Sequence, residues 1–200
     1  MRDRGDVAAL INLFEAIARQ EGWQPGEQLR AHADHSTYFA AYVGGELAGG
    51  MQVVVPDTSG RLPFHAVWPD VEMGIPARIA HVPILAIRPE FRGPLRLFWP
   101  LCVELWRFCA LRGFDTIVIE ATPAMLARYR RVGWGLEVIG DLRMHWGEEC
   151  FLCRANVQAV AGTMLARSLR SSAFRTLVCQ AMRPMKPVRE RDCVLQPALP

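Results

Sequence analysis

Apolar residues follow a helical period at the start of the chain and a strand period soon afterwards. Between positions 6 and 23 they recur every three or four residues, which predicts an amphipathic helix that ends at Trp23-Gln24-Pro25-Gly26. Residues 37–55 predict two strands joined at Gly44-Gly45, a two-residue hairpin signal. The next segment, 56–78, is rich in Pro and Gly and has no period. The segment is long for a loop, which indicates that it has a function and lies over a site.

The centre of the chain alternates strands and helices. Residues 79–87 form a nearly continuous apolar run, as expected of a central strand, but Pro83 lies inside it. Because proline removes a ladder hydrogen bond, we expect this strand to bulge or splay at Pro83. The pattern then predicts a helix over 94–113, a buried strand over 114–121 and a helix over 122–134. Thr122 as N-cap and Pro123 at the first helical position open the last of these.

The last part of the chain predicts a strand pair and one more helix. The segments 135–146 and 148–157 are typical of an antiparallel pair, and a helix follows from about Gln158. The whole order predicts a mixed α/β (α+β) domain over residues 1–157. Residues 158–200 are expected to form a C-terminal helical extension with a mobile tail, since the tail has little packing signal.

Composition narrows the class of protein. Of 200 residues, 51% are hydrophobic, which supplies a core, and the formal net charge of +3 does not suggest a nucleic-acid partner. The N-terminus has no signal-peptide pattern, and no apolar run is long enough to span a bilayer. Four of the six cysteines lie within predicted helices and strands, which favours free thiols in a reducing cytoplasm. Cys150 and Cys153 form a lone C-x-x-C without a second ligand pair, so no metal site is expected.

The central elements resemble those of the GNAT acyltransferase superfamily. The segment "AIRPEFRG" follows the predicted central strand, and the motif "YRRVGW" (129–134) ends the second helix, in that family's order. The resemblance covers about residues 38–134. It implies a mixed, mostly antiparallel central sheet flanked by helices, with a splayed central strand that binds an acyl thioester. It therefore implies N-acyltransferase activity with no permanently bound cofactor.

A narrower resemblance is to acyl-homoserine-lactone synthases and N-acyl amino acid synthases. The chain has "GW" at Gly22-Trp23, the "RLP…AVWP" stretch over 61–69, and Ile139-Gly140 before the last strand. The acceptor implied is the amine of an amino acid or a homoserine-lactone precursor. The chain departs from the lactone synthases where they carry charged or aromatic residues, so the acceptor stays open. Those positions here are Leu13, Ile17, Thr37, His81 and Ile84.

The turn after the central strand bears on the acyl donor. In CoA-binding relatives several glycines close the backbone around a pyrophosphate. Here Gly93 is followed by Pro94, which has no N–H, and by the bulky Leu95. We therefore expect a single phosphate to be held by the turn and by Arg92 or Arg96, as the phosphopantetheine of acyl-carrier protein would require. Acyl-CoA is the second candidate donor.

The resemblance also implies which groups hold the donor. Leu85 and Ile87 would offer backbone groups to the pantetheine. An acidic carrier protein should dock on a group of arginines. These arginines are Arg88, Arg92, Arg96, Arg128, Arg130 and Arg131.

Three residues are candidates for proton transfer. Tyr129 occupies the position where many GNAT enzymes place a tyrosine that protonates the departing thiolate. His81 is a candidate base on the central strand, and Glu120, at the end of the next strand, is the alternative base. Each also has a structural interpretation: Tyr129 as helix packing, His81 as a core histidine, and Glu120 as a capping or salt-bridge group.

Four residues are candidates for an acceptor or acyl pocket. Trp23, His35 and Trp68 are the aromatic candidates, although large aromatic residues more often belong to a core. Asp34 matches one acidic position of the lactone synthases. Two other functions fit the same fold, namely a CoA-dependent N-acetyltransferase and a non-catalytic module that binds an acyl thioester.

Overall fold

The central sheet holds six strands in the order β1-β2-β3-β4-β6-β5, and only β3 and β4 are parallel. The computed structural model describes residues 4–25, 27–75, 78–93, 97–172, 174–176 and 179. The strands are β1 Ser36–Val43, β2 Glu46–Val54, β3 Ile79–Ile87, β4 Thr116–Ala121, β5 Glu137–His145 and β6 Glu148–Asn156. The α-helices are α1 Arg4–Glu21, α2 Gln28–Ala31, α3 Phe98–Leu111, α4 Pro123–Arg131 and α5 Val157–Arg170. Short 3-10 turns are η1 Ala33–His35, η2 Pro63–Ala66 and η4 Pro89–Phe91.

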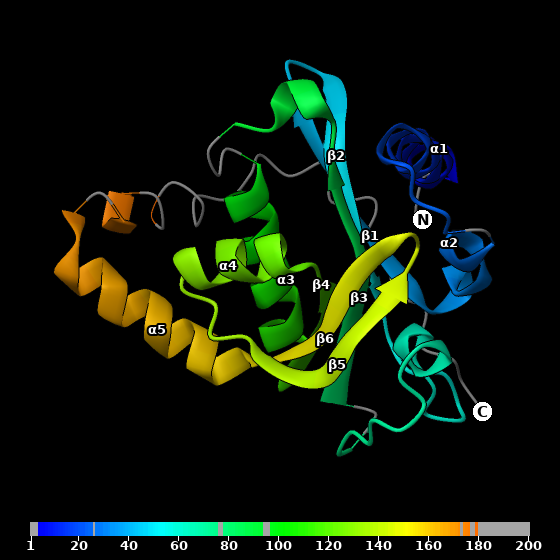
Figure 1. Ribbon diagram of the computed structural model, residues 1–200. Helices are drawn as coiled ribbons and strands as arrows, with labels where there is room; N and C mark the ends of the chain where they lie inside the picture. The colour runs from blue at the N-terminus through cyan, green and yellow to red at the C-terminus, as the bar shows by residue number, and fades with distance from the viewer. Residues whose placement is uncertain are drawn as a thin grey trace.

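Helices cover both faces of the sheet (Figure 1). On one face α3 and α4 pack over β3 and β4, and α5 lies beside α3. On the other face α1 and α2 contribute Leu10, Phe14, Ile17 and Leu29 to a cluster that includes Ile84 of β3. The long segment after β2 also packs on this face, since Phe64 and Trp68 are fully buried there.

Local sequence signals position most of the elements. Gly44 and Gly45 have φ of 61° and 90°, as a two-residue hairpin turn requires, and they join β1 to β2. Thr122 caps α4, because its Oγ1 accepts a hydrogen bond from the Met125 N–H at 3.2 Å. The strand pair predicted near the end of the chain is confirmed as β5 and β6. Of the helix predicted over 94–113, α3 is seen from Phe98 onwards, and residues 94–96 lie outside the described residues.

Pro83 has the two effects predicted for it. Val82 and Pro83 of β3 together oppose Val53 of β2, which is a β-bulge. The bulge reverses the alternation of side chains, so His81 before it and Ile84 after it turn to the same face. The parallel ladder with β4 ends at the pair Val82 and Ile119, beyond which β3 continues along β2 alone. The predicted splay of the central strand is therefore confirmed.

Candidate active site

A cavity opens where β3 and β4 separate. Its volume is about 100 Å³, enough for a few water molecules. Pro83 and Leu85 line it from β3, Glu120 from β4, and Tyr129 from α4. The other lining residues are Trp23, Val82, Ile84, Ile119, Thr122, Met125, His145, Trp146, Glu148 and Cys150. The cavity therefore brings together candidates that are far apart in the sequence.

Tyr129 reaches the cavity from the face of the sheet that α3 and α4 cover. Tyr129 is only 2% exposed and packs against the rings of Phe98 at 5.0 Å and Trp134 at 5.7 Å. Burial raises the pKa of the Tyr129 phenol well above its usual range. The phenol is therefore neutral and can act as a proton donor.

From the opposite face the cavity receives a buried carboxylate between two imidazoles. Glu120 Oε2 lies 2.6 Å from His145 Nδ1, and Glu120 Oε1 lies 3.1 Å from His81 Nε2. Both imidazoles act on Glu120 as hydrogen-bond partners, although the pair of His81 Nε2 and Glu120 Oε1 falls outside strict hydrogen-bond geometry. The side chain of Glu120 is 3% exposed, that of His145 is 9% exposed and that of His81 is fully buried. Both histidines and Glu120 therefore form one electrostatic unit.

The two imidazoles keep Glu120 ionised. Burial favours the neutral acid, but the contacts with His145 and His81 outweigh it and lower the pKa of Glu120 below its usual value. Glu120 and His145 line the cavity, while His81 lies behind Glu120 and is not among the lining residues. Of the two bases suggested by the sequence, only Glu120 reaches the cavity in the described structure.

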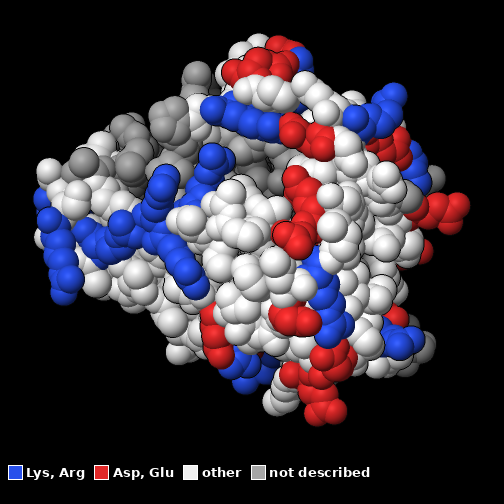
Figure 2. Space-filling view, in the orientation of Figure 1, with Lys and Arg blue, Asp and Glu red and all other residues white. Residues whose placement is uncertain are grey.

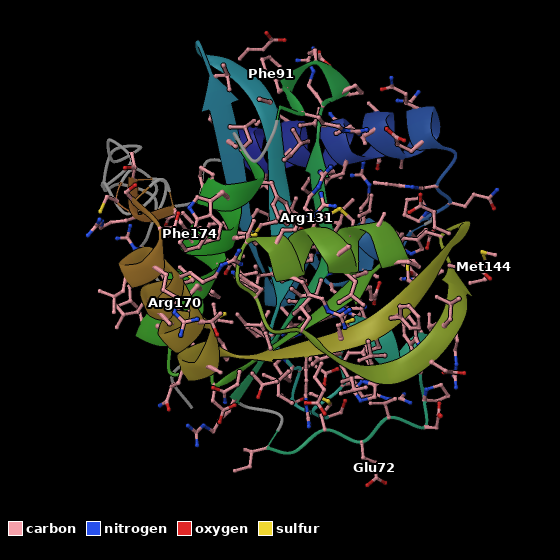
Figure 3. The ribbon with its side chains drawn as sticks, turned by 60° about the vertical axis from the view of Figure 1, so that its left-hand side comes forward. Glu72, Phe91, Arg131, Met144, Arg170 and Phe174 are labelled. Carbon is pink, nitrogen blue, oxygen red and sulfur yellow. The ribbon has the colours of Figure 1, made fainter. Side chains whose placement is uncertain are left out.

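His145 was not predicted from the sequence. It is the last residue of β5, next to the turn that leads into β6. Met144 projects away from the protein at this end of the hairpin and is 64% exposed (Figure 3). Because side chains alternate along a strand, His145 turns inward, where it meets Glu120 and the edge of the Trp68 ring.

The predicted pocket residues are divided between the cavity, the core and the surface. Trp23 lines the cavity, and its buried indole N–H has no hydrogen-bond partner among the described residues. Trp68 is a core residue whose indole N–H donates to the Asp141 carbonyl at 2.9 Å. Asp34 and His35 lie in η1, are exposed, and are not among the lining residues.

The turn after β3 is tied to its surroundings. Arg92 Nε donates to the Ile87 carbonyl at 2.7 Å, and Arg92 also forms an ion pair with Glu21 of α1 at 2.7 Å. Gly93 is exposed and donates its N–H to the Phe91 carbonyl at 2.9 Å. Leu95 and Arg96, the other residues predicted to hold the donor, lie outside the described residues.

Exposed arginines gather over the ends of α4 and α5, on the left of the view in Figure 2. We call this group the arginine surface; its exposed members are Arg128, Arg130, Arg131 and Arg170, and Arg167 is half-buried. In the part of the chain that the structure describes, none of them forms an ion pair. Arg88 differs from them, because it pairs with Glu46 and Glu90. Of the predicted docking arginines, those of α4 are therefore available to an acidic partner.

Cysteine and metal chemistry find little support at this site. Cys150 lines the cavity, but burial and the nearby carboxylate of Glu120 raise its pKa to about 12, which disfavours a thiolate nucleophile. Among the described residues no group of three or more His, Cys, Asp or Glu side chains is arranged to hold a metal ion. No described helix has the length and apolar character needed to cross a membrane.

Comparison with known proteins gives a family and a fold. Residues 19–156 match the model of a family described as N-acyl amino acid synthase FeeM. The FeeM structure from uncultured soil microbes is 16% identical with a TM-score of 0.61, over 80% of this chain and 94% of that chain. The CoA-dependent acyl-homoserine lactone synthase BjaI, solved with MTA, is 15% identical with a TM-score of 0.64, over 90% and 84%. No curated protein matches.

A GNAT-family structure shares the same fold. It is a putative acetyltransferase from Desulfovibrio desulfuricans, 14% identical with a TM-score of 0.50, over 78% of this chain and 96% of that chain. At these identities the structural likenesses establish the fold and no more. The predicted GNAT-like architecture is thereby confirmed.

Proposed function

Since the chain belongs to the N-acyl amino acid synthase FeeM family of acyltransferases, we propose that it moves an acyl group from acyl-carrier protein to the amine of a small acceptor such as an amino acid. The observation that carries this proposal is the cavity at the splay of β3 and β4. It joins a neutral phenol, Tyr129, on one side of the sheet to an ionised carboxylate, Glu120, on the other.

The proposed reaction needs one proton acceptor and one proton donor. The acceptor amine, after losing a proton to solvent, attacks the thioester carbonyl, so that a C–N bond forms and the C–S bond breaks. Glu120 takes the second proton from the nitrogen, and Tyr129 gives its proton to the departing thiolate. Solvent then returns a proton to Tyr129 and removes one from Glu120. His81 and His145 hold Glu120 in place and in its charged form.

Two features support a carrier protein over CoA as the donor. The turn after β3 has one glycine followed by Pro94, which lacks the N–H that a pyrophosphate would need. The arginine surface supplies positive charge, without ion pairs among the described residues, at the end of α4, whose side chains Met125 and Tyr129 line the cavity. Acyl-carrier protein is acidic and presents its acyl chain on a single phosphate, so it satisfies both features.

Reversing charge on the arginine surface should weaken the use of acyl-carrier protein selectively. For an Arg128→Glu, Arg131→Glu double variant we expect KM for the acylated carrier to rise by about tenfold, because attraction becomes repulsion. The KM for an acyl-pantetheine thioester should not change. Steady-state kinetics with the two donors provides the measurement, and Arg19→Glu on α1 is the matched control. An equal rise for both donors would contradict a docking role.

Removing the Tyr129 hydroxyl should slow acyl transfer. We expect Tyr129→Phe to lower kcat by about 10²-fold, the usual scale for one proton-transfer group. The loss should shrink with a donor whose thiol is more acidic, because that thiolate leaves without a proton. Tyr42→Phe, at an exposed position of β1, is the control. Unchanged kcat with both donors would leave Tyr129 as a packing residue.

The acceptor and the chain length can be read from the products. Mass spectrometry of lipid extracts would compare a host expressing the chain with one expressing the Tyr129→Phe, His81→Ala variant. A new acyl-amide that is absent from the control supports the synthase, and its mass gives both the acceptor and the acyl length. If purified protein binds acylated carrier but forms no amide with any amino acid, a non-catalytic module is favoured. Efficient transfer from acetyl-CoA alone would favour an acetyltransferase.

A further inference from the structure

Both ring nitrogens of His145 have oxygen partners. Nδ1 lies 2.6 Å from Glu120 Oε2, and Nε2 lies 3.3 Å from Gln28 Oε1 on α2. The imidazole is therefore held between a buried carboxylate and a surface amide. Which protons it carries depends on whether these two partners accept or donate.

Trp146 decides the orientation of the Gln28 amide. Its indole Nε1 lies 2.6 Å from Gln28 Oε1. An indole N–H can only donate, so the amide atom that it meets must be the oxygen. The same oxygen faces His145 Nε2, and two acceptors do not attract each other. His145 Nε2 must therefore carry a hydrogen.

The other nitrogen of His145 faces an ionised group. A hydrogen lies between Glu120 Oε2 and His145 Nδ1, and it belongs to the stronger base of the pair; imidazole is a stronger base than a carboxylate, so Glu120 accepts this hydrogen bond as the anion. A contact of 2.6 Å from Glu120 Oε2 to Nδ1 thus requires a hydrogen on Nδ1 as well.

We infer that His145 is an imidazolium in the resting protein, and that Gln28 and Trp146 are positioning residues that keep it in this form. The imidazolium then supplies the positive charge that keeps Glu120 ionised inside the sheet. In the proposed function, on which this last role rests, Gln28 and Trp146 would maintain the proton acceptor without touching the substrate.

The backbone of the β5–β6 turn fixes where the Trp146 indole lies. Trp146 and Gly147 have φ of 52° and 93°, as a two-residue hairpin turn of type I′ requires. Here the Trp146 carbonyl accepts a hydrogen bond from the Gln24 N–H at 2.9 Å, and the indole binds Gln28. The turn is thus fastened to the segment between α1 and α2.

The inference predicts a shift in the acid limb of the pH profile of kcat/KM, the range in which activity falls as the pH is lowered. Without its cationic partner Glu120 would have a higher pKa, because burial then acts unopposed by His145. The carboxylate would be ionised only at higher pH, so activity would be lost at low pH and regained on raising the pH. The titratable groups around His145 are Glu120, His81, Glu148, Cys150, Tyr129 and, beyond His81, His32.

Nitrogen NMR of the imidazole rings tests the inference without any activity assay. The protein has five histidines, and the His145→Gln variant assigns the signal of His145. At neutral pH we expect both nitrogens of His145 to be protonated in the unaltered protein. Gln28→Leu should leave Nε2 unprotonated, and because Gln28 is exposed the variant should fold. Gln24→Leu, an exposed glutamine of the same segment, should change nothing. A bare nitrogen on His145 in the unaltered protein would overturn the inference.

Kinetics then tests the link to the proposed function. In Gln28→Leu and Trp146→Phe the acid limb of kcat/KM should move to higher pH by about one unit. Gln28→Glu, which keeps an oxygen acceptor, should keep the limb in place or move it lower. If NMR shows the imidazolium and the limb does not move, the protonation state stands and the role of Glu120 as proton acceptor fails. A loss of activity that no pH restores would mean that Gln28 and Trp146 act through the fold alone.

Discussion

Glu120→Gln is expected to abolish most of the acyl transfer while the protein stays folded. The amide has the shape of the carboxylate but accepts no proton, so kcat should fall by about 10²- to 10⁴-fold, the scale of a general base. The cause is local, because Glu120 lies at the splay with both oxygens next to imidazoles. Product formation with saturating acylated carrier and acceptor measures the loss.

The same variant should also lower stability. It replaces the carboxylate that both buried imidazoles contact, and a buried polar group left imperfectly paired costs about 1–3 kcal/mol. Glu137→Gln is the matched control, because Glu137 pairs with Arg154 on the surface of the same sheet and its side chain is 60% exposed. That control should keep both activity and stability. A Glu120→Gln protein that unfolds at lower denaturant concentration yet turns over normally would remove Glu120 from the mechanism.

Gly50→Ala should destabilise the fold more than Gly49→Ala, the other change of glycine to alanine in β2. A Cβ at Gly50 would lie 2.2 Å from the Phe39 carbonyl oxygen of β1 and 2.7 Å from Leu10 Cδ1 of α1. The first contact is with backbone and cannot be relieved by a rotamer change. Interiors are close-packed, so we expect a loss of about 3 kcal/mol in the free energy of unfolding. The melting temperature should then fall by roughly 6–12 °C.

A second glycine supplies the control for that measurement. Gly162 lies in α5, and a Cβ there would meet no atom within 4 Å. Gly162→Ala should therefore raise stability by about 0.5–1 kcal/mol, because alanine is the better helix former. Calorimetry or urea unfolding of both variants compares the same chemical change in opposite surroundings. Equal effects at the two positions would mean that α1 does not pack on β2 as described.

Local signals in the sequence predicted most of the architecture. A proline inside an apolar run has few compatible structures, and Pro83 produced both the bulge and the splay expected of it. Thr122 followed by Pro123 marked the beginning of α4 at the residue where it occurs. These features depend on neighbours in the chain, which is why they can be read without knowledge of the tertiary structure.

His145 could not be predicted in the same way, because its position depends on strand register. β5 has register shifts between Val138 and Gly140 and again between Gly140 and Arg143, so simple alternation does not show which of its residues face inward. One signal was present: Trp146-Gly147 is a two-residue turn, and the residue before it pairs with Glu148. Counting back from that turn would have placed His145 beside the end of β4. It would not have predicted the contact between His145 and Glu120.

The pocket residues show a similar limit. Trp23 and Trp68 are both large and aromatic, and their sequence surroundings do not distinguish a cavity wall from a core. The structure separates them by their hydrogen bonds, since the Trp68 indole is satisfied by Asp141 and that of Trp23 has no partner among the described residues. Such a difference arises from contacts across more than seventy residues of chain.

The sheet also consists of two halves that meet at its one parallel ladder. One half is β1, β2 and β3, the other is β4, β6 and β5, and the parallel ladder between them has four residue pairs, from Ile79 with Thr116 to Val82 with Ile119. All other ladders are antiparallel. Because the residues of this seam are almost all buried, its amide hydrogens should be protected, and exchange with solvent should be faster beyond Val82 and Ile119, where the two strands part. Further parting at this end of the seam would let one cavity admit acyl chains of different length without unfolding the protein.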